Sequence, residues 1–162
     1  IFDNDSSFEI GEIGVKPFSI PHDAADPVGY SFMCGDEKVA VATDIGELKK
    51  DLFEAIRGSK TVLLESNHDV NMLEIGKYPP QLKRRIRGKL GHLSNDDAGR
   101  AAEFLVRLGT ERIILGHLSE ENNYPELARQ TVICVLNDAG IKCGRDVLLG
   151  VALPQQTVSL CG

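Results

Sequence analysis

Long hydrophobic runs are absent from this sequence, which also contains no tryptophan and few other aromatic residues. The longest apolar stretches, within 61–64 and 112–116, are far shorter than the ~20 residues of a membrane-spanning helix. The opening segment 1–14 is acidic, which does not match a signal peptide. We therefore expect a protein that has no membrane partner and works in the cytoplasm.

Metal and disulfide motifs built on cysteine are also lacking. No two of the four cysteines have the C-x-x-C spacing of a zinc ribbon or a redox motif. Cys34 and Cys134 lie in apolar runs, which predicts small buried core residues. An absence of disulfides agrees with the reducing cytosol as the expected compartment.

Positive charge is scarce, since the net charge is −6 at pH 7. A protein with this balance is not expected to hold nucleic acid by bulk attraction. One segment, 82–89, is basic although the chain as a whole is acidic. It is either a solvated helix face, the usual meaning of an isolated run, or a strip that contacts phosphates. Its cations are Lys83, Arg84, Arg85, Arg87 and Lys89.

Apolar residues, in contrast, are plentiful enough to bury a core, at 42% of 162 residues. Periodicity and turn residues predict strands at 13–20, 28–34, 37–44, 60–66, 111–116, 146–153 and 156–161. They predict helices at 47–56, 68–76, 78–88, 93–109 and 124–140. We expect the turn Gly35-Asp36 to join a hairpin, and Ser94 to cap the helix that follows it. Together these elements predict an α/β domain with a mixed sheet and flanking helices.

Ionisable residues cluster where the predicted strands end. His22 and Asp23 follow the first strand, Asp44 follows the third, and Glu65 ends the fourth. Asn67, His68 and Asp69 come directly behind Glu65, and His117 follows the next strand. Loops at strand ends are where α/β sheets build their sites. Histidine and carboxylate are ligands for zinc, manganese or iron, and they also serve acid-base chemistry.

Each of these residues, taken alone, has an ordinary structural explanation. Asp44 could cap the helix after it, Glu65 could be a buried acid with a partner, and Asn67 and Asp69 could cap a short helix. His92 and His117 could be loop residues whose following serines cap helices. The coincidence of His, Asp and Glu at several independent strand ends is harder to explain by capping alone.

Five segments together resemble a known family. They are "PFSIPHDAADPVGYSF", "VATDIG", "LLESNHD", "YPPQLKRRIRGKLGHLSN" and "GHLSEENN". They are similar to the metallo-β-lactamase-fold hydrolases of the YycJ (WalJ) branch, over roughly residues 8–140. The resemblance implies an αββα sandwich with a two-metal site between its sheets, and hydrolysis of DNA in an exonuclease-like manner. The tRNA 3′-processing endonucleases are more distant relatives.

The resemblance also implies roles for individual residues. His22 and His117 match histidines that each bind one metal, and Asp44 matches the aspartate that bridges both. His92 resembles a histidine that hydrogen-bonds a phosphate oxygen or assists the leaving group, so His92 and Asp44 are the expected catalytic residues. Glu65, Asn67, His68 and Asp69 would orient ligands. Asn122 and Asn123 would contact substrate or order the His117 loop.

One large part of the family pattern is absent. The sequence has no H-x-H-x-D-H motif, and it lacks the strand-ending aspartate that precedes that motif in the family. We therefore expect residues 1–162 to be the C-terminal half of a single metallo-β-lactamase domain, with partial or no metal occupancy. Half a sandwich also leaves an apolar sheet face open. We expect the absent half, or a second copy of this chain, to cover it.

These observations favour a phosphodiesterase or exonuclease that uses two divalent ions, zinc or manganese, with DNA rather than RNA as its partner. The basic strip that precedes His92 would supply local positive charge. Two alternatives stay open. One is a hydrolase of the same fold that acts on a small ester or thioester, and the other is a non-catalytic half-domain that pairs with a partner.

Overall fold

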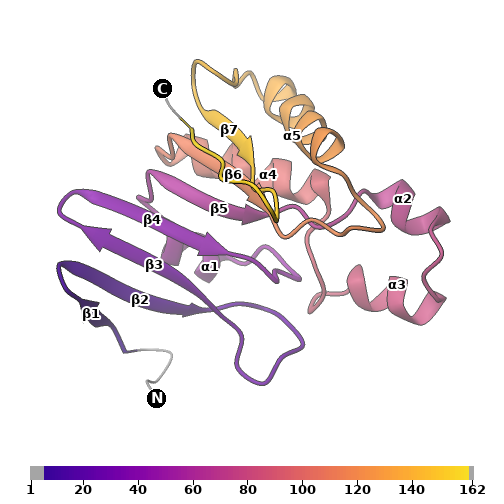
Figure 1. Cartoon of the computed structure of the whole chain (residues 1–162), viewed down its shortest axis with the longest axis horizontal. Helices are drawn as coiled ribbons and strands as arrows, with labels where there is room; N and C mark the ends of the chain where they lie inside the picture. Colours follow the sequence, from indigo (N-terminus) through magenta and orange to yellow (C-terminus); the bar gives the residue numbers. More distant parts are fainter. Residues whose placement is uncertain (1–5, 161–162) are drawn as a thin grey trace.

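A computed structural model describes residues 6–160 of the chain. Its strands form one seven-stranded sheet in the order β1-β2-β3-β4-β5-β6-β7 (Figure 1). They are β1 (Phe8–Ile10), β2 (Ile13–Ser19), β3 (Val28–Cys34), β4 (Glu37–Ala42), β5 (Thr61–Glu65), β6 (Arg112–Gly116) and β7 (Leu148–Val151). The helices are α1 (Lys50–Ile56), α2 (Val70–Ile75), α3 (Pro80–Ile86), α4 (Asn95–Arg107) and α5 (Pro125–Asp138).

The sheet is mixed, as the sequence predicted. Strands β1 to β4 pair antiparallel, whereas β4 to β7 pair parallel. The β3–β4 hairpin turns at Gly35-Asp36, where Gly35 has a φ of 56°, a conformation that glycine adopts without strain. Because β4, β5 and β6 run parallel, their carboxyl ends meet at one edge of the sheet. In Figure 1 that edge faces α2 and α3.

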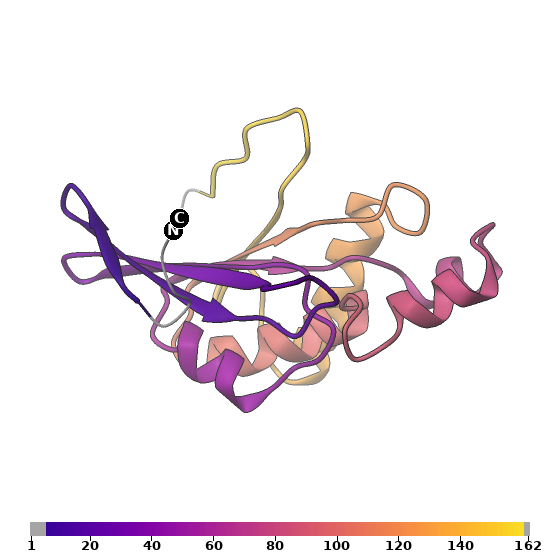
Figure 2. The ribbon, with the colours of Figure 1, turned by 90° about the horizontal axis from the view of Figure 1, so that it is seen from below.

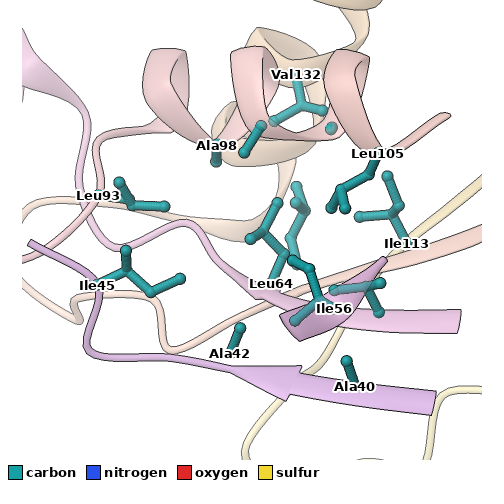
Figure 3. Close-up of a cluster of buried hydrophobic side chains, with 14 of the residues drawn as sticks. Ala40, Ala42, Ile45, Ile56, Leu64, Leu93, Ala98, Leu105, Ile113 and Val132 are labelled. Atoms are coloured by element: carbon teal, nitrogen blue, oxygen red, sulfur yellow. The ribbon is translucent and has the colours of Figure 1, made fainter. Parts of the chain in front are cut away.

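Helices α1, α4 and α5 cover one face of the sheet (Figure 2). Alternate strand residues point into this layer, and Ala40, Val62 and Ile113, neighbours on β4, β5 and β6, are all fully buried. Figure 3 shows Leu64 and Ile113 facing Leu105 of α4 in the cluster that forms the core. The helix layer is therefore packed as in a complete domain.

The opposite face of the sheet is apolar and only partly buried. Tyr30, Val41, Leu63 and Ile114 are neighbours on β3 to β6, and each of them keeps partial exposure. Figure 2 shows no helix on this side, where only the segment after β7 folds back. Gly150 of β7 lies where an added Cβ would be 2.7 Å from the Leu160 side chain. The tail thus packs on the β7 end and leaves the middle of the face open.

The predicted strand at 156–161 is wrong for the residues described. Residues 157–160 have no strand pairing, and Gln156 makes only an isolated bridge to Leu153. Residues 154–155 form a turn after β7, and Figure 2 shows this segment on the open side of the sheet. Cys161, the last residue of the predicted strand, lies outside the described residues.

The predicted burial of two cysteines is also wrong, because Cys34 and Cys134 are exposed. Cys34 ends β3 at the hairpin turn, where no layer covers the strand. Cys134 lies on α5, whose buried residues Ala128, Val132 and Leu136 repeat every four positions. Position 134 falls on the other side of the helix. The apolar runs around both cysteines therefore did not show in which direction each cysteine side chain points.

Element boundaries differ modestly from those predicted. The predicted helix at 47–56 begins only at Lys50, and the predicted strand at 37–44 ends at Ala42, which leaves Asp44 in a loop. Ser94 caps α4 as predicted, since its side chain accepts a hydrogen bond from the Asp97 backbone N–H. Of the helices in residues 6–160, none combines the length and the apolar character needed to cross a membrane.

Candidate metal centre

Four side chains meet at the carboxyl edge of the parallel strands. Asp44 follows β4 and His117 follows β6, while His22 follows β2 and His92 precedes α4. The Asp44 Oδ1 atom lies 3.7 Å from His22 Nε2, 3.6 Å from His92 Nδ1 and 3.7 Å from His117 Nδ1. The ring centroid of His92 lies 5.0 Å from that of His22 and 5.3 Å from that of His117. The predicted approach of Asp44, His117 and His22 is confirmed.

Glu65, the last residue of β5, holds this cluster from beneath. Its carboxylate is fully buried, and Oε1 accepts hydrogen bonds from His92 Nδ1 at 2.8 Å and His117 Nδ1 at 2.7 Å. Its Oε2 accepts from the backbone N–H groups of Ile45 at 2.7 Å and Leu93 at 3.1 Å. Because both imidazoles donate Nδ1–H to Glu65, each leaves Nε2 for a metal or a substrate.

Electrostatics keep this carboxyl ionised. Burial acts to raise the pKa of Glu65, but hydrogen bonds from His117 and His92 outweigh it and lower the pKa below its ordinary value. The same hydrogen bond from His117 to Glu65 raises the pKa of His117. The pair therefore keeps a proton on His117 Nδ1, which fixes the orientation of the ring.

Asp44 and His117 share an unusual backbone conformation. Their φ angles are 60° and 57°, and within residues 6–160 they are the only non-glycine residues in the left-handed region. Such conformations persist where the surroundings impose them, and they concentrate at functional sites. The Asn67 amide donates to the His117 carbonyl at 2.9 Å, while Glu65 holds the residue after Asp44.

The capping explanation for Asp44 does not hold. The residue at the N-cap position of α1 is Lys49, and no side chain accepts a capping hydrogen bond there. Asp44 instead points its carboxylate at the three histidines, with a side-chain exposure of 40%. A carboxylate that is held in a strained loop and serves no helix is free to bind a ligand.

The loop that carries His22 is tied to the loop before His92. His22 Nδ1 donates to the Gly91 carbonyl at 3.1 Å, which leaves its Nε2 directed toward Asp44. The Gly46 N–H donates to the Pro21 carbonyl at 2.8 Å. A Cβ at Gly46 would be 2.4 Å from the Lys89 carbonyl oxygen, so only glycine permits this approach. Three loops are thereby fixed against one another around the cluster.

Buried amides order the His117 loop. The Asn123 Nδ2 atom donates to the backbone carbonyls of Ser66 at 2.9 Å and Asn67 at 3.1 Å, and it contacts Asn95 Oδ1 at 2.9 Å. Asn95, which the sequence analysis missed, donates in return to Asn123 Oδ1 at 3.0 Å. Asn95 is the first residue of α4, directly after its N-cap, where a polar residue is ordinary, so no local pattern marked it.

The other residues near Glu65 lie in the scaffold around the site. The Asp69 side chain caps α2 by accepting from the Met72 N–H, which was the alternative explanation for that residue. Asn122 is buried, and its backbone carbonyl accepts from the Asp69 N–H at 2.9 Å. His68 is buried as well, its Nδ1 has no hydrogen-bond partner among residues 6–160, and burial lowers its pKa. His68 is therefore a neutral imidazole inside the fold.

A cavity of about 520 Å³ opens above the cluster. Its walls come from the site loops, from α3 and the residues before it, and from the loop after β6. They are His22, Asp44, Asn67, Tyr78, Leu82, Arg85, Ile86, His92 and His117, together with 118–121.

The basic strip is not a continuous positive surface. Arg85 pairs with Asp23, at 2.8 Å between Nη2 and Oδ1, and Lys83 donates to the Glu74 backbone carbonyl. The remaining pairs are Arg87 with Glu74 and Lys89 with Glu47. Of the five cations, only Arg85 lines the cavity. Whether the strip contacts nucleic acid stays a prediction.

The donor set matches a divalent metal. Asp44, Glu65, His92 and His117 each offer one ligand atom, and these atoms all lie within 4.8 Å of one another. Glu65 is already committed to four N–H donors, so its role is to orient the histidines. The carboxylate of Asp44 and the Nε2 atoms of His92 and His117 are donors of the type that zinc and manganese accept. His22 lies outside this group of four, but its Nε2 is directed toward Asp44.

Known proteins resemble this chain over most of its length. A family model described as the beta-lactamase superfamily domain matches residues 1–118. Exodeoxyribonuclease YycJ of Bacillus anthracis is 42% identical over 134 residues, covering 83% of this chain and 51% of that protein. Exodeoxyribonuclease WalJ of Streptococcus pneumoniae is 38% identical over 146 residues, covering 90% of this chain and 54% of that protein.

The same likeness appears in three dimensions. The metallo-β-lactamase fold protein YhfI from Bacillus subtilis superposes with a TM-score of 0.65 at 14% identity, covering 93% of this chain and 51% of that one. At this identity the likeness concerns the fold alone. The chain spans about half the length of the curated relatives it matches.

Proposed function

Because the chain belongs to the β-lactamase superfamily, where it has the metallo-β-lactamase fold and falls in the YycJ-like branch, we propose that it is the C-terminal half of a metal-dependent DNA exonuclease. The observation that carries this proposal is the convergence of His22, Asp44 and His117 at one edge of the sheet. The names of the two relatives, both exodeoxyribonucleases, support DNA as the substrate.

His22, Asp44 and His117 would contribute part of the ligand set for two divalent ions, zinc or manganese. Such ions, when bound, activate water and neutralise the charge of a phosphodiester. The histidines contribute neutral ligands, so the site does not add negative charge that would repel the phosphate. The strained loops and the Glu65 hydrogen bonds fix these ligands before a substrate arrives.

His92 is the proposed general acid. Its Nδ1–H is held by Glu65, so the proton it can transfer is the one on Nε2. Cleavage of the phosphodiester leaves an alkoxide on the departing sugar, and the Nε2 proton of the imidazolium moves to that oxygen. The hydrogen bond to buried Glu65 also fixes the orientation of the His92 ring during this transfer.

The site needs further ligands. A zinc ion takes at least three protein ligands, and three residues shared between two ions fall short. We propose that a segment bearing the H-x-H-x-D-H motif supplies the rest and covers the open face of the sheet. Two observations support this: the chain spans about half the length of its relatives, and Val41, Leu63 and Ile114 remain partly exposed.

An activity assay tests the proposal. End-labelled DNA is incubated with residues 1–162 and, separately, with the chain joined to a preceding family segment that carries H-x-H-x-D-H. We expect the completed protein to release nucleotides with Zn²⁺ or Mn²⁺ but not with a chelator, and the chain alone to leave DNA intact. Intact DNA with turnover of a p-nitrophenyl ester would instead identify a small-ester hydrolase. Inactivity on both substrates would indicate a non-catalytic module.

A further inference from the structure

The segment between β5 and α4 builds one wall of the cavity. Helices α2 and α3 project from the site edge of the sheet as a small arm (Figure 1). Residues from this arm, Tyr78, Leu82, Arg85 and Ile86, face the metal-ligand cluster across the cavity. None of them belongs to the ligand set. The arm therefore bounds the space that a substrate would occupy beside the reacting phosphate.

Charge is distributed unevenly between the cavity walls. Arg85 is the only lysine or arginine among the lining residues, and Glu120 and Glu121 lie in the loop that forms another wall. A phosphate backbone would be attracted toward α3 and repelled from that loop. The α3 wall is therefore the part of the cavity that offers a phosphate a positive charge, although the chain as a whole is acidic.

Arg85 is positioned next to the ligand cluster by one carboxylate. The Asp23 Oδ1 atom lies 2.8 Å from Arg85 Nη2 and 3.4 Å from His22 Nε2, so it stands between the two side chains. The Asp23 pair occupies two of the five guanidinium N–H donors. The three donors that remain suit a phosphate oxygen, and the pairing lowers the entropy that Arg85 would lose on binding.

Tyr78 is the only aromatic residue among the lining residues apart from the histidines, and it is partly exposed. Pro79 and Pro80 follow it and begin α3, which restricts the backbone on which Tyr78 stands. Aromatic side chains beside a basic group are the usual stacking platform for the bases of single strands.

We propose that Tyr78 and Arg85 form the subsite for the nucleotide adjacent to the reacting phosphate, in which Arg85 binds that nucleotide's own phosphate and Tyr78 stacks on its base. The inference rests on the proposed nuclease function and names the side chains that would hold the end of a DNA strand in that site.

The first test uses the completed, metal-loaded protein and a labelled single-stranded oligonucleotide. We expect Arg85→Ala to raise KM about tenfold, because it removes a charged hydrogen bond. The slope of log binding against log salt should become shallower by about 0.7, as for one lost phosphate contact on a single strand. Arg100→Ala is the matched control, since Arg100 also forms an exposed pair with an aspartate, Asp97, but does not line the cavity.

The second test concerns the base. Tyr78→Ala should raise KM several-fold, whereas Tyr78→Phe should retain the wild-type KM. With an oligonucleotide that carries an abasic residue at its end, the KM values of wild type and Tyr78→Ala should become equal. Melting temperatures of all variants confirm folding. Active wild type with Arg85→Ala and Tyr78→Ala both matching Arg100→Ala would overturn the subsite. A wild type that leaves DNA intact would overturn the proposed function itself.

Discussion

Among single residues, Glu65 connects the most segments of the site. One fully buried carboxylate receives N–H groups from the loops after β4 and β6 and from two consecutive residues before α4, His92 and Leu93. Its value lies in that convergence, because removing it would leave four donors without their acceptor. A buried donor without a partner costs about 1–3 kcal/mol. The histidines would also lose the restraint that directs their Nε2 atoms.

Asp44→Asn should abolish metal-dependent DNA cleavage by the completed protein while leaving its melting temperature unchanged. Asparagine tolerates the left-handed φ of 60° as aspartate does, so the backbone keeps its conformation. The neutral amide removes the charge that two ions would share. Cleavage rates and thermal melts of both proteins measure this effect. Near-normal turnover in Asp44→Asn would mean that Asp44 is a structural loop residue.

At the scale of elements, the sequence predicted where the site lies better than how it is held together. His22, Asp44 and His117 could be found because polar residues at strand ends break the pattern of apolar strands. The pairing of Arg85 with Asp23 spans 62 positions and follows from the path of α3. No local pattern could indicate it.

Two other elements show why local patterns have limits. The apolar run at 156–161 matched a strand, but a strand also needs a partner strand. After β7 the chain turns over the open face, and Gln156 makes only an isolated bridge to Leu153. The sequence predicted Glu65 as a buried acid with a partner, and the family resemblance predicted that it orients ligands, but neither indicated its four donors. Its four donors come from three segments that meet only in the folded sheet.

The turn between α5 and β7 should contribute a pH-dependent stability. The Arg145 guanidinium and the Lys142 backbone N–H lower the pKa of Asp146 to about 2, from a value of 3.8. A carboxyl whose folded pKa lies below its unfolded pKa stabilises the fold fully above the unfolded value, and the contribution is lost as pH falls toward the folded value.

We therefore expect the melting-temperature difference between wild type and Asp146→Asn to be constant above about pH 5 and to shrink between about pH 4 and pH 2. Asp138→Asn, which removes an exposed carboxylate with no ion pair among residues 6–160, is the control. A difference that stays the same down to pH 2 would show that Asp146 does not contribute through its charge.

At the scale of the whole molecule, we expect substitutions on the two faces of the sheet to change stability by different amounts. Ile113 and Ile114 are consecutive on β6, yet Ile113 is fully buried against the helices while Ile114 lies on the open face. In the isolated chain, Ile113→Ala should cost about 2–5 kcal/mol of unfolding free energy, and Ile114→Ala distinctly less. In the completed protein the two costs should become similar.

Urea denaturation of both variants, at two protein concentrations, measures these costs. Equal costs in the isolated chain at every concentration would mean that this chain alone closes the face. Equal costs that appear only at high concentration would indicate that a second copy covers it, since self-association makes stability depend on concentration.

The central claim is that this chain carries part of a two-metal site, and counting bound metal tests it most directly. Native mass spectrometry with zinc titration is applied to residues 1–162 and to the completed protein. We expect two tightly bound ions in the completed protein and fewer than two in the chain alone, and we expect Asp44→Asn to lose both. Two tight sites in the isolated wild-type chain would contradict it.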